Sequence, residues 1–362
     1  MADELREWFD AAFFRSLAVT VKAQHPPFVE QAFLEEALAG LEALTLMARL
    51  QRAAALLGSH LPDDYDEALA IVLAVTPHYS GHFRALLGPA FVAHCGRHDP
   101  ARSLDALRVM TRHGSAEFAV RHFLKDDFEA TIAVMQDWAG DDDHHVRRLA
   151  SEGCRPRLPW SFRLERLVAD PDPAIPILER LKADAEPYVR TSVANHLNDI
   201  GKDHPERMLD LVSGWDRSDA NTAWIVRHAC RSLIKAGHPR ALALHGFGET
   251  PLVDLCDLTV TPRAVPWEGV ANLAFTLVSR GRTAQRLAID YVMHYVKANG
   301  STAPKVFKLR VVELAAGGTL PVATRRSFEE RTTRRHYPGR HRIDIQINGV
   351  VCGSVAFDLL AP

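Results

Sequence analysis

The segment 151–160, SEGCRPRLPW, gathers side chains that can act on a charged substrate. Glu152 supplies a carboxylate, Arg155 and Arg157 supply guanidiniums, and Trp160 adds an aromatic face, on a backbone stiffened by two prolines. Carboxylates stabilise positive charge, guanidiniums bind anions, and aromatic faces attract cations. A simple connector needs none of these groups. The segment therefore indicates a binding or catalytic site.

Helices near this segment carry further charged groups at helical spacing. Arg148 stands four residues before Glu152, so both side chains share one helix face, and Glu117 and Arg121 repeat that spacing in SAEFAVRH. Asp199 belongs to a polar line on a later helix. Each has an ordinary alternative, because such pairs are solvated ion pairs in most helices and Asp199 is near a helix end. Spacing alone leaves their roles open.

Two other motifs predict no metal or phosphate site. The run DDDHH (141–145) resembles a metal site only superficially, because adjacent carboxylates before a helix usually cap its free N–H groups. The segment HGFG (245–248) follows no strand and lacks a G-x-G-x-x-G or Walker pattern, which indicates a helix stop. The five cysteines are widely spaced and never form C-x-x-C, so we expect reduced thiols.

Up to about residue 245 the chain reads as helical, because apolar residues recur every three or four positions between Pro and Gly breaks. A Val-Arg pair recurs early in four of these helices, with its arginines 26, 43 and 37 residues apart. These arginines are Arg121, Arg147, Arg190 and Arg227. Repeats of about 40 residues built from paired helices are typical of HEAT-like solenoids, which offer a concave face to an extended ligand.

After about residue 250 the composition changes to runs rich in Val, Ile, Phe and Tyr, which predict strands. In HRIDIQINGV (341–350), isoleucines alternate with polar residues before Asn348-Gly349, which predicts a hairpin with its polar face outward. About 100 such residues indicate an immunoglobulin-like β-sandwich, although no Cys-Trp-Cys pattern is present. We predict an α+β multidomain chain: an all-α HEAT-like solenoid over residues 1–250 and the β-sandwich over residues 258–362.

The charge is distributed unevenly. The formal net charge is -2, but residues 1–100 carry -6, residues 101–257 carry -4 and residues 258–362 carry +8. The basic C-terminal third predicts a polyanionic partner, with a basic domain that has no partner as the alternative. The acidic start is unlike a secretory signal, and no apolar run approaches the roughly 20 residues that span a bilayer. We therefore expect a cytoplasmic protein.

Three blocks resemble the AlkC branch of the HEAT-like bacterial DNA alkylation-repair glycosylases. They are VRRLASEGCRPRLPW, DPDPAIPILERLKADAEPYVRTSVANHLNDIGKDHPE and WIVRHACRSLIKAGHPRALAL. The resemblance is dense over residues 114–248 and extends to members with an immunoglobulin-like C-terminal domain. It implies base excision repair, in which the N-glycosidic bond of cationic bases such as 3-methyladenine and 3-methylcytosine is hydrolysed in duplex DNA. It also implies no metal or organic cofactor and no full base flipping.

The resemblance assigns catalysis to Asp199, Glu152, Glu117 and Trp160. The carboxylates would stabilise the cationic sugar and position or deprotonate water, while the indole favours a charged base. Carboxylates beside DNA are repelled by the phosphates unless arginines neutralise them. Basic segments of the C-terminal third would form a second set of phosphate contacts. The residues predicted to contact DNA are Arg148, Arg155, Arg157, Arg190, Trp224, Arg227, Lys305, Lys308, Arg334 and Arg335.

Two alternatives use the same scaffold without catalysis. A DNA-structure-binding relative would have lost an acidic residue, whereas Glu152 and Asp199 are both present. A protein-binding HEAT scaffold would have an apolar or acidic concave face in place of an arginine-rich one. We therefore predict a glycosylase whose partner is alkylated double-stranded DNA, nucleoid-associated when bound, with no membrane contact and no obligate protein partner. We expect a monomer.

Overall fold

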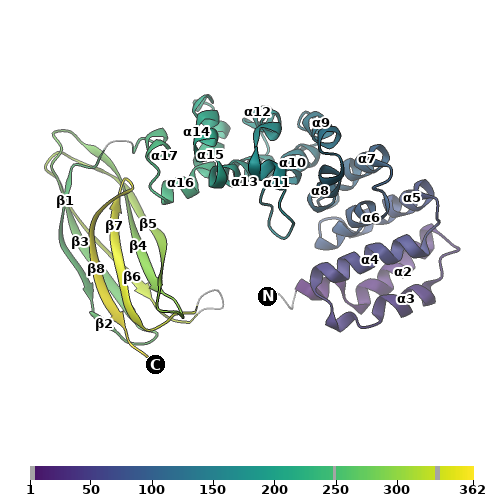
Figure 1. Cartoon of the computed structure of the whole chain (residues 1–362), viewed down its shortest axis with the longest axis horizontal. Helices are drawn as coiled ribbons and strands as arrows, with labels where there is room; N and C mark the ends of the chain where they lie inside the picture. Colours follow the sequence, from purple (N-terminus) through teal and green to yellow (C-terminus); the bar gives the residue numbers. More distant parts are fainter. Residues whose placement is uncertain (1–4, 248–249, 331–334) are drawn as a thin grey trace. The chain divides into compact units, whose positions relative to one another are not determined.

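The computed structural model describes residues 5–247, 250–330 and 335–362, with helices first and strands after them (Figure 1). The α-helices are α2 (Ala11–Gln24), α3 (Glu30–Leu38), α4 (Leu46–His60), α5 (Tyr65–Val75), α6 (Leu87–Cys95), α7 (Pro100–Met110), α8 (Glu117–Asp126), α9 (Phe128–Trp138), α10 (His144–Gly153), α11 (Glu165–Ala169), α12 (Ile175–Leu181), α13 (Pro187–Asp203), α14 (Pro205–Ser213), α15 (Ala220–Ala229), α16 (Arg231–Lys235) and α17 (Pro239–Leu244). The short 3-10 helices are η1 (Glu7–Phe9), η2 (Leu41–Ala43), η3 (Thr76–Tyr79), η4 (Phe83–Leu86) and η5 (Asp172–Ala174). Among the described residues, no helix has the length and apolarity that crossing a membrane requires.

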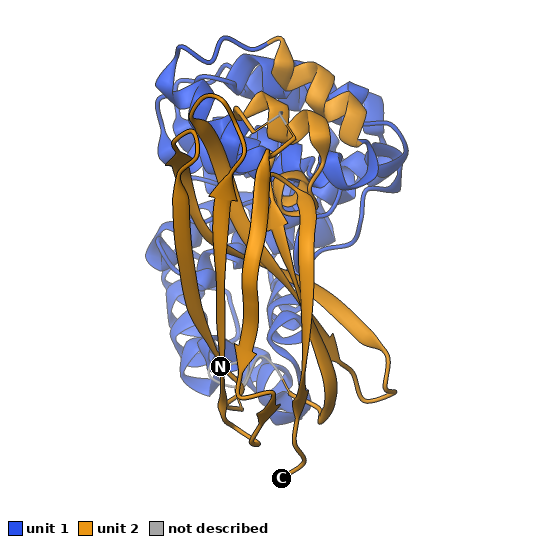
Figure 2. Ribbon diagram, turned by 90° about the vertical axis from the view of Figure 1, so that its left-hand side faces the viewer, with its two compact units in different colours: residues 1–204, 215–229 blue, residues 205–214, 230–362 orange. Residues whose placement is uncertain are grey.

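The chain forms two compact units, coloured separately in Figure 2. Unit 1 holds residues 1–204 and 215–229, and unit 2 holds residues 205–214 and 230–362. Helices give way to strands between Leu244 and Val253. Unit 2 thus includes α14, α16 and α17 together with the strands. The domain bounds 1–250 and 258–362 stay a prediction.

Unit 1 is built from helices that pack in sequence order, as a HEAT-like solenoid requires. In α10 the stripe Val146, Leu149 and Ala150 is fully buried, as the periodicity predicted. Its neighbour α13 buries Val189, Val193, Leu197 and Ile200 in the same way. Because α10 contacts α8, α9, α12 and α13, polar residues beside its buried stripe face side chains of other helices.

Two of the four repeated Val-Arg arginines, Arg147 and Arg190, brace the turns before their helices. Arg147 donates through Nη1 to the carbonyls of Asp141 (3.0 Å) and Asp142 (2.9 Å), just before its own helix. Its Nε also lies 2.7 Å from Asp184 Oδ2, in the turn that precedes α13. Arg190 repeats the first of these arrangements on the carbonyls of that turn, at Asp184 (2.9 Å) and Ala185 (2.6 Å). In these two repeats the arginine therefore holds the turn before its own helix in place.

The strands of unit 2 form two sheets, which pack as the predicted immunoglobulin-like sandwich. The smaller sheet has the order β1 (Val253–Thr261), β3 (Val270–Ser279) and β6 (Thr319–Ser327). The larger sheet has the order β2 (Ala264–Val265), β8 (Val350–Leu359), β7 (Gly339–Ile347), β4 (Gln285–Val296) and β5 (Thr302–Leu314). Neighbouring strands are antiparallel except for the short parallel pair β2 and β8. Buried side chains from both sheets, such as Phe275 and Ile345, form one hydrophobic core.

The predicted hairpin joins β7 and β8, but its polar face does not point to solvent. Asn348 and Gly349 both have positive φ, 46° and 78°, as a two-residue hairpin turn of type I′ requires. Asp344 and Gln346 are only 7% and 6% exposed, so the expectation of an outward polar face is wrong. The reason is that side chains of neighbouring strands cover this face: Asp344 accepts hydrogen bonds from His294 on β4 at 2.7 Å and from Ser354 on β8.

The turn glycine Gly349 should tolerate no side chain. A Cβ there would lie 2.8 Å from Gly237 Cα and 2.5 Å from Leu242 Cδ1, in addition to the backbone strain of φ +78°. Gly300 has the same φ but open space around it, so Gly300→Ala reports the backbone cost alone, about 1–2 kcal/mol. We expect Gly349→Ala to lower the free energy of unfolding by at least about 1 kcal/mol more. Equal losses in equilibrium urea unfolding would contradict this packing.

Candidate active site

Five buried or nearly buried ionic side chains of unit 1 form an alternating chain of charge, here called the charged cluster. Arg148 Nη1 lies 3.0 Å from Glu117 Oε2, and its Nη2 lies 3.4 Å from Glu152 Oε1. Arg155 continues the chain, with Nη1 2.7 Å from Glu152 Oε1 and Nη2 2.8 Å from Asp199 Oδ2. The cluster thus joins α8, α10, the segment after α10, and α13.

Pairing with opposite charges keeps Glu152 and Arg148 ionised despite their burial. Glu152 is 5% exposed, Arg155 7% and Asp199 1%. Burial raises the pKa of Glu152, but Arg148 and Arg155 outweigh that effect and leave the pKa below its ordinary value. Burial likewise opposes the charge of Arg148, whereas Glu117 and Glu152 outweigh it and raise the pKa of the guanidinium. Glu152 therefore remains a carboxylate at neutral pH.

A residue whose role the sequence did not reveal, Arg121, holds the segment that carries the cluster. Its guanidinium is fully buried and donates to the carbonyls of Gly153 (3.0 Å), Arg155 (2.6 Å) and Phe162. Burial lowers the pKa of Arg121 to about 10, so it still carries its charge at neutral pH. The predicted partner of Arg121, Glu117, pairs with another arginine. The i, i+4 interpretation of that pair is wrong, because Arg121 points into the solenoid.

The last residue of α10 has to be a glycine, because the segment after α10 that carries Arg155 runs close to neighbouring helices. A Cβ on Gly153 would lie 2.5 Å from Val120 Cγ1 and 3.0 Å from Met135 Cε, atoms of α8 and α9. The chain can therefore leave α10 close against these helices only without a side chain at this position. Because the chain passes so close to α8 and α9, the carbonyls of residues 153 and 155 can accept hydrogen bonds from the buried guanidinium of Arg121.

The charged cluster borders a cleft of about 390 Å³. Glu117, Glu152 and Arg155 are among its polar lining, while much of the remaining wall is apolar. Trp160 stands at its edge, 66% exposed and with a left-handed φ of 63°. Asp199 lies behind Arg155 and also holds Lys202, whose Nζ is 2.8 Å from Asp199 Oδ1. Two of the three predicted catalytic carboxylates therefore face the cleft, and the third supports them.

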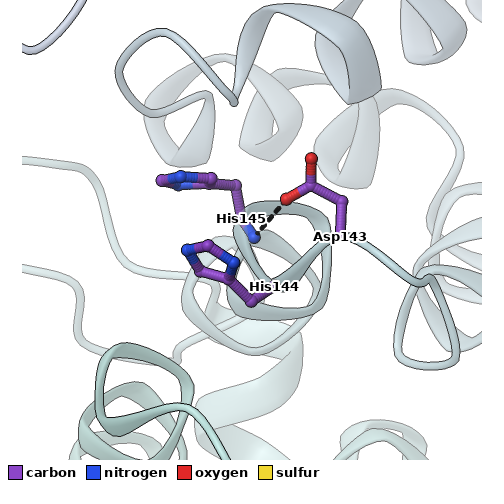
Figure 3. Close-up of side chains that lie close together, drawn as sticks. All are labelled: Asp143, His144 and His145. Carbon is purple, nitrogen blue, oxygen red and sulfur yellow. Dashed lines mark hydrogen bonds between the residues drawn. The ribbon is translucent and has the colours of Figure 1, made fainter.

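The run before α10 caps that helix, as predicted. Asp143 Oδ1 accepts from the backbone N–H of His145 at 2.8 Å, the bond drawn in Figure 3. Its other carboxylate oxygen lies 2.8 Å from Arg112 Nε. Ligand atoms of Asp143, His144 and His145 do lie within 4.8 Å of one another. Because capping and the guanidinium already use both carboxylate oxygens, we assign this group a structural role.

Comparisons with known proteins cover both parts of the chain. The family model "DNA alkylation repair enzyme" matches residues 108–233, which include the charged cluster. The model "Uncharacterised protein YhaZ, C-terminal Ig-like domain" matches residues 254–361. The uncharacterized protein YhaZ of Bacillus subtilis (strain 168) is 38% identical over 360 residues, which cover 99% of this chain and 100% of YhaZ.

A solved structure extends the similarity to the whole fold. It is the Pseudomonas fluorescens alkylpurine DNA glycosylase AlkC bound to DNA containing an abasic site analog, with 47% sequence identity, a TM-score of 0.95 and 99% of each chain covered. The chain belongs to the AlkC family. The resemblance seen in the three sequence blocks is thereby confirmed. The AlkC fold also confirms the helical solenoid followed by an immunoglobulin-like part.

The structure revises how arginines of this AlkC-family chain were expected to meet DNA. Arg148 and Arg155 are counter-ions of the cluster carboxylates, so phosphates would have to compete with these ion pairs, and DNA contact by both stays a prediction. Arg157 forms two hydrogen bonds of 2.7 Å with Asp203, and Arg190 braces a turn. The sequence supplied the residue types but not these partners, which lie on other helices or turns. DNA contact by Arg157 and Arg190 stays a prediction.

The remaining predicted DNA contacts lie outside the charged cluster. In unit 1, Trp224 stacks on His228 with ring centroids 4.9 Å apart. Arg227 is exposed on α15.

In unit 2, Lys305 and Lys308 are exposed on β5, and Lys305 Nζ lies 5.4 Å from the Phe307 ring centroid. Arg335 is also exposed, while Arg334 lies outside the described residues. DNA contact by all of these residues stays a prediction.

Removing the central arginine should destabilise the protein strongly. Arg155→Met leaves Glu152 and Asp199 buried without their shared counter-ion, which costs about 3–5 kcal/mol in such sites. Arg102→Met is the control, because Arg102 pairs with Asp66 at an exposed site where the loss is about 0–1 kcal/mol. The measurement is equilibrium urea unfolding of both variants and the wild type.

The pH dependence of this loss gives a second readout. Glu152 in Arg155→Met loses one of the two guanidiniums that depress its pKa, so its folded-state pKa rises. A raised carboxyl pKa costs stability at neutral pH, and the cost shrinks as acidification neutralises the group. The deficit of the variant should therefore decrease between pH 7 and pH 5. A deficit that stays constant over this range, or matches that of the control, would contradict the cluster's electrostatic role.

Proposed function

We propose that this AlkC-family protein is a DNA glycosylase that hydrolyses the N-glycosidic bond of cationic alkylated bases in duplex DNA. Bases alkylated at N3, such as 3-methyladenine and 3-methylcytosine, are the substrate class. The observation that carries the proposal is the charged cluster beside an aromatic-edged cleft, within a chain 47% identical to a DNA-bound alkylpurine glycosylase. The reaction yields an abasic site and so begins base excision repair.

The substrate's own charge simplifies the chemistry. A base with a positive charge leaves as a neutral molecule, so the enzyme does not have to protonate it. The remaining barrier is the positive charge that develops on the deoxyribose, together with the arrival of water at its anomeric carbon. Both demands are met by carboxylates, which stabilise a cation and accept a proton from water. No step of this scheme requires more than water and side chains.

The geometry divides these tasks between the carboxylates. Glu117 and Glu152 line the cleft, and we assign them to stabilising the cationic sugar and to orienting and deprotonating the water. Their effect is strong because the apolar wall lowers the local dielectric. Asp199 holds Arg155 through Nε at 2.9 Å and Nη2 at 2.8 Å, so we assign it to positioning and to the field of the site. Trp160 offers its face to the charged base, a contact worth about 0.5–2 kcal/mol.

DNA binding is proposed to involve both parts of the chain. Exposed basic residues, including Arg227 on α15 and Lys305 and Lys308 on β5, supply charge for phosphate contacts. Such contacts make affinity fall steeply as salt rises. We further propose a monomer that acts in the bacterial cytoplasm, associated with the nucleoid when bound to DNA, without an obligate protein partner. We also propose that the glycosidic bond is cleaved without full rotation of the base out of the duplex.

Substitution of single carboxylates tests the proposed roles. We expect Glu152→Gln and Asp199→Asn to lower the single-turnover rate of 3-methyladenine release by about a hundredfold or more, because each loses charge that stabilises the sugar cation. The dissociation constant for the same duplex should change little. Glu129→Gln is the matched control, since Glu129 is an exposed carboxylate of α9 paired with Arg166, and should retain the wild-type rate.

The outcomes separate catalysis from binding. A wild-type protein that binds duplex DNA but releases no base from any methylated substrate would be a DNA-structure-binding relative, and the glycosylase proposal would be wrong. Wild-type activity with fully active Glu152→Gln would instead show that the reaction uses other groups. Release rates that fall together with DNA affinity would point to a binding defect.

A further inference from the structure

One wall of the cleft comes from a part of the chain that the sequence did not connect with function. Phe83 begins η4, far in sequence from the segment that carries Trp160, yet both residues line the same cleft. Their ring centroids lie 6.2 Å apart, and the ring planes meet at 70°. The two rings therefore meet edge to face, rather than as a parallel stack.

Phe83 is supported from behind. Its ring packs against Trp8 at 5.2 Å and against Phe9 at 6.2 Å, and Phe9 is fully buried. The next residues of η4, Ala85 and Leu86, are also buried. The Phe83 ring thus projects from a firmly packed base, which holds its position in the absence of a ligand.

Trp160 shows the opposite combination of features. It is 66% exposed, and its φ of 63° lies in the left-handed region that residues with a Cβ seldom occupy. A large apolar side chain held in the open on an unfavourable backbone does not contribute to the core. Backbone strain of this kind collects at ligand sites, where the position of a side chain matters more than its conformational energy.

The polar groups of the cleft indicate which ligand the two rings suit. Glu117 and Glu152 line the same space, and the phenyl ring of Phe83 offers no hydrogen-bonding group. A flat ring with positive charge gains from both aromatic faces and from the carboxylates, whereas a neutral ring gains only dispersion and burial. Because the Trp160 indole is largely exposed at the cleft edge, a base has to leave its stack only far enough to reach that edge.

We propose that Phe83 and Trp160 form an aromatic cage that binds the alkylated base through its positive charge. This proposal rests on the proposed glycosylase function and concerns the selectivity of that enzyme. Phe83 determines how well a cationic base is distinguished from its neutral counterpart. The normal, uncharged bases of DNA are held weakly because they gain no cation–π attraction. The cage also acts as one wall of the site in which the carboxylates meet the sugar.

Substitutions that separate the aromatic ring from simple bulk test the cage. Phe83→Leu keeps an apolar side chain, and Phe83→Tyr keeps the ring. We expect Phe83→Leu to lower the single-turnover rate of 3-methyladenine release by roughly three- to thirtyfold, the range that corresponds to one cation–π contact. Phe83→Tyr should remain within about twofold of wild type. Val109→Ala, at an exposed site on α7, controls for the effect of mutation.

Two binding measurements exclude a merely structural role. The first uses duplex DNA with 3-deaza-3-methyladenine, a neutral isostere of the lesion, and the second uses a neutral tetrahydrofuran abasic analogue. Phe83→Leu should bind both within about twofold of wild type, because neither carries the charge that the cage recognises. Thermal unfolding verifies that each variant is folded at the assay temperature.

The outcomes keep the cage and the glycosylase apart. If the wild type releases 3-methyladenine but Phe83→Leu is equally fast, or Phe83→Tyr is as slow as Phe83→Leu, the cage is wrong and the glycosylase stands. If affinity for the neutral isostere falls by the same factor as the rate, Phe83 contributes apolar contact and does not recognise charge. If the wild type releases no base, the proposed function fails and the cage fails with it.

Discussion

The structure of unit 1 depends on the electrostatic balance of five ionic side chains between its helices. Burying one carboxylate alone costs several kcal/mol. Glu152 and Asp199 are tolerated because both contact Arg155, while Glu152 also pairs with Arg148 and Asp199 also pairs with Lys202. Arg155 can lie between these carboxylates because α10 ends at Gly153, where the chain passes close to α8 and α9. Arg121 then holds the following segment by its carbonyls. Charge balance, helix packing and the path of this segment are therefore one arrangement.

The same arrangement accounts for function. A carboxylate that is ionised, desolvated and fixed in position stabilises an adjacent cation more strongly than a solvated one does. The guanidiniums that hold the pKa of Glu152 low also keep its carboxylate in one orientation at the cleft. In the proposed mechanism, stability and catalysis therefore depend on the same contacts, which differs from the common case where an active site weakens the fold.

Features that depend on local spacing were predictable from the sequence. The buried stripe of α10, the cap at Asp143 and the Asn348-Gly349 turn all follow from neighbours along one element. Contacts between elements were not predictable. Arg148 does pair with Glu152 as spacing suggests, but its second partner, Glu117, lies on another helix.

The site was predictable in its composition and not in its geometry. The resemblance to AlkC proteins named the carboxylates and Trp160, but it did not reveal that Arg148 and Arg155 form ion pairs with those carboxylates. Phe83 carried no signal, because a single aromatic residue between His82 and Arg84 belongs to no recognisable motif, and only the fold places it beside a cleft. The covered polar face of β7 was missed for a similar reason, since its partners lie on β4 and β8.

The most direct test of the central claim is the affinity of the wild-type protein for two duplexes that differ only in charge at the reacting sugar. One contains a positively charged pyrrolidine abasic analogue, and the other contains the neutral tetrahydrofuran analogue. If the charged cluster stabilises a cationic deoxyribose, the pyrrolidine duplex should bind at least about tenfold more tightly at the same salt concentration. Equal affinities, or tighter binding of the neutral analogue, would contradict the account.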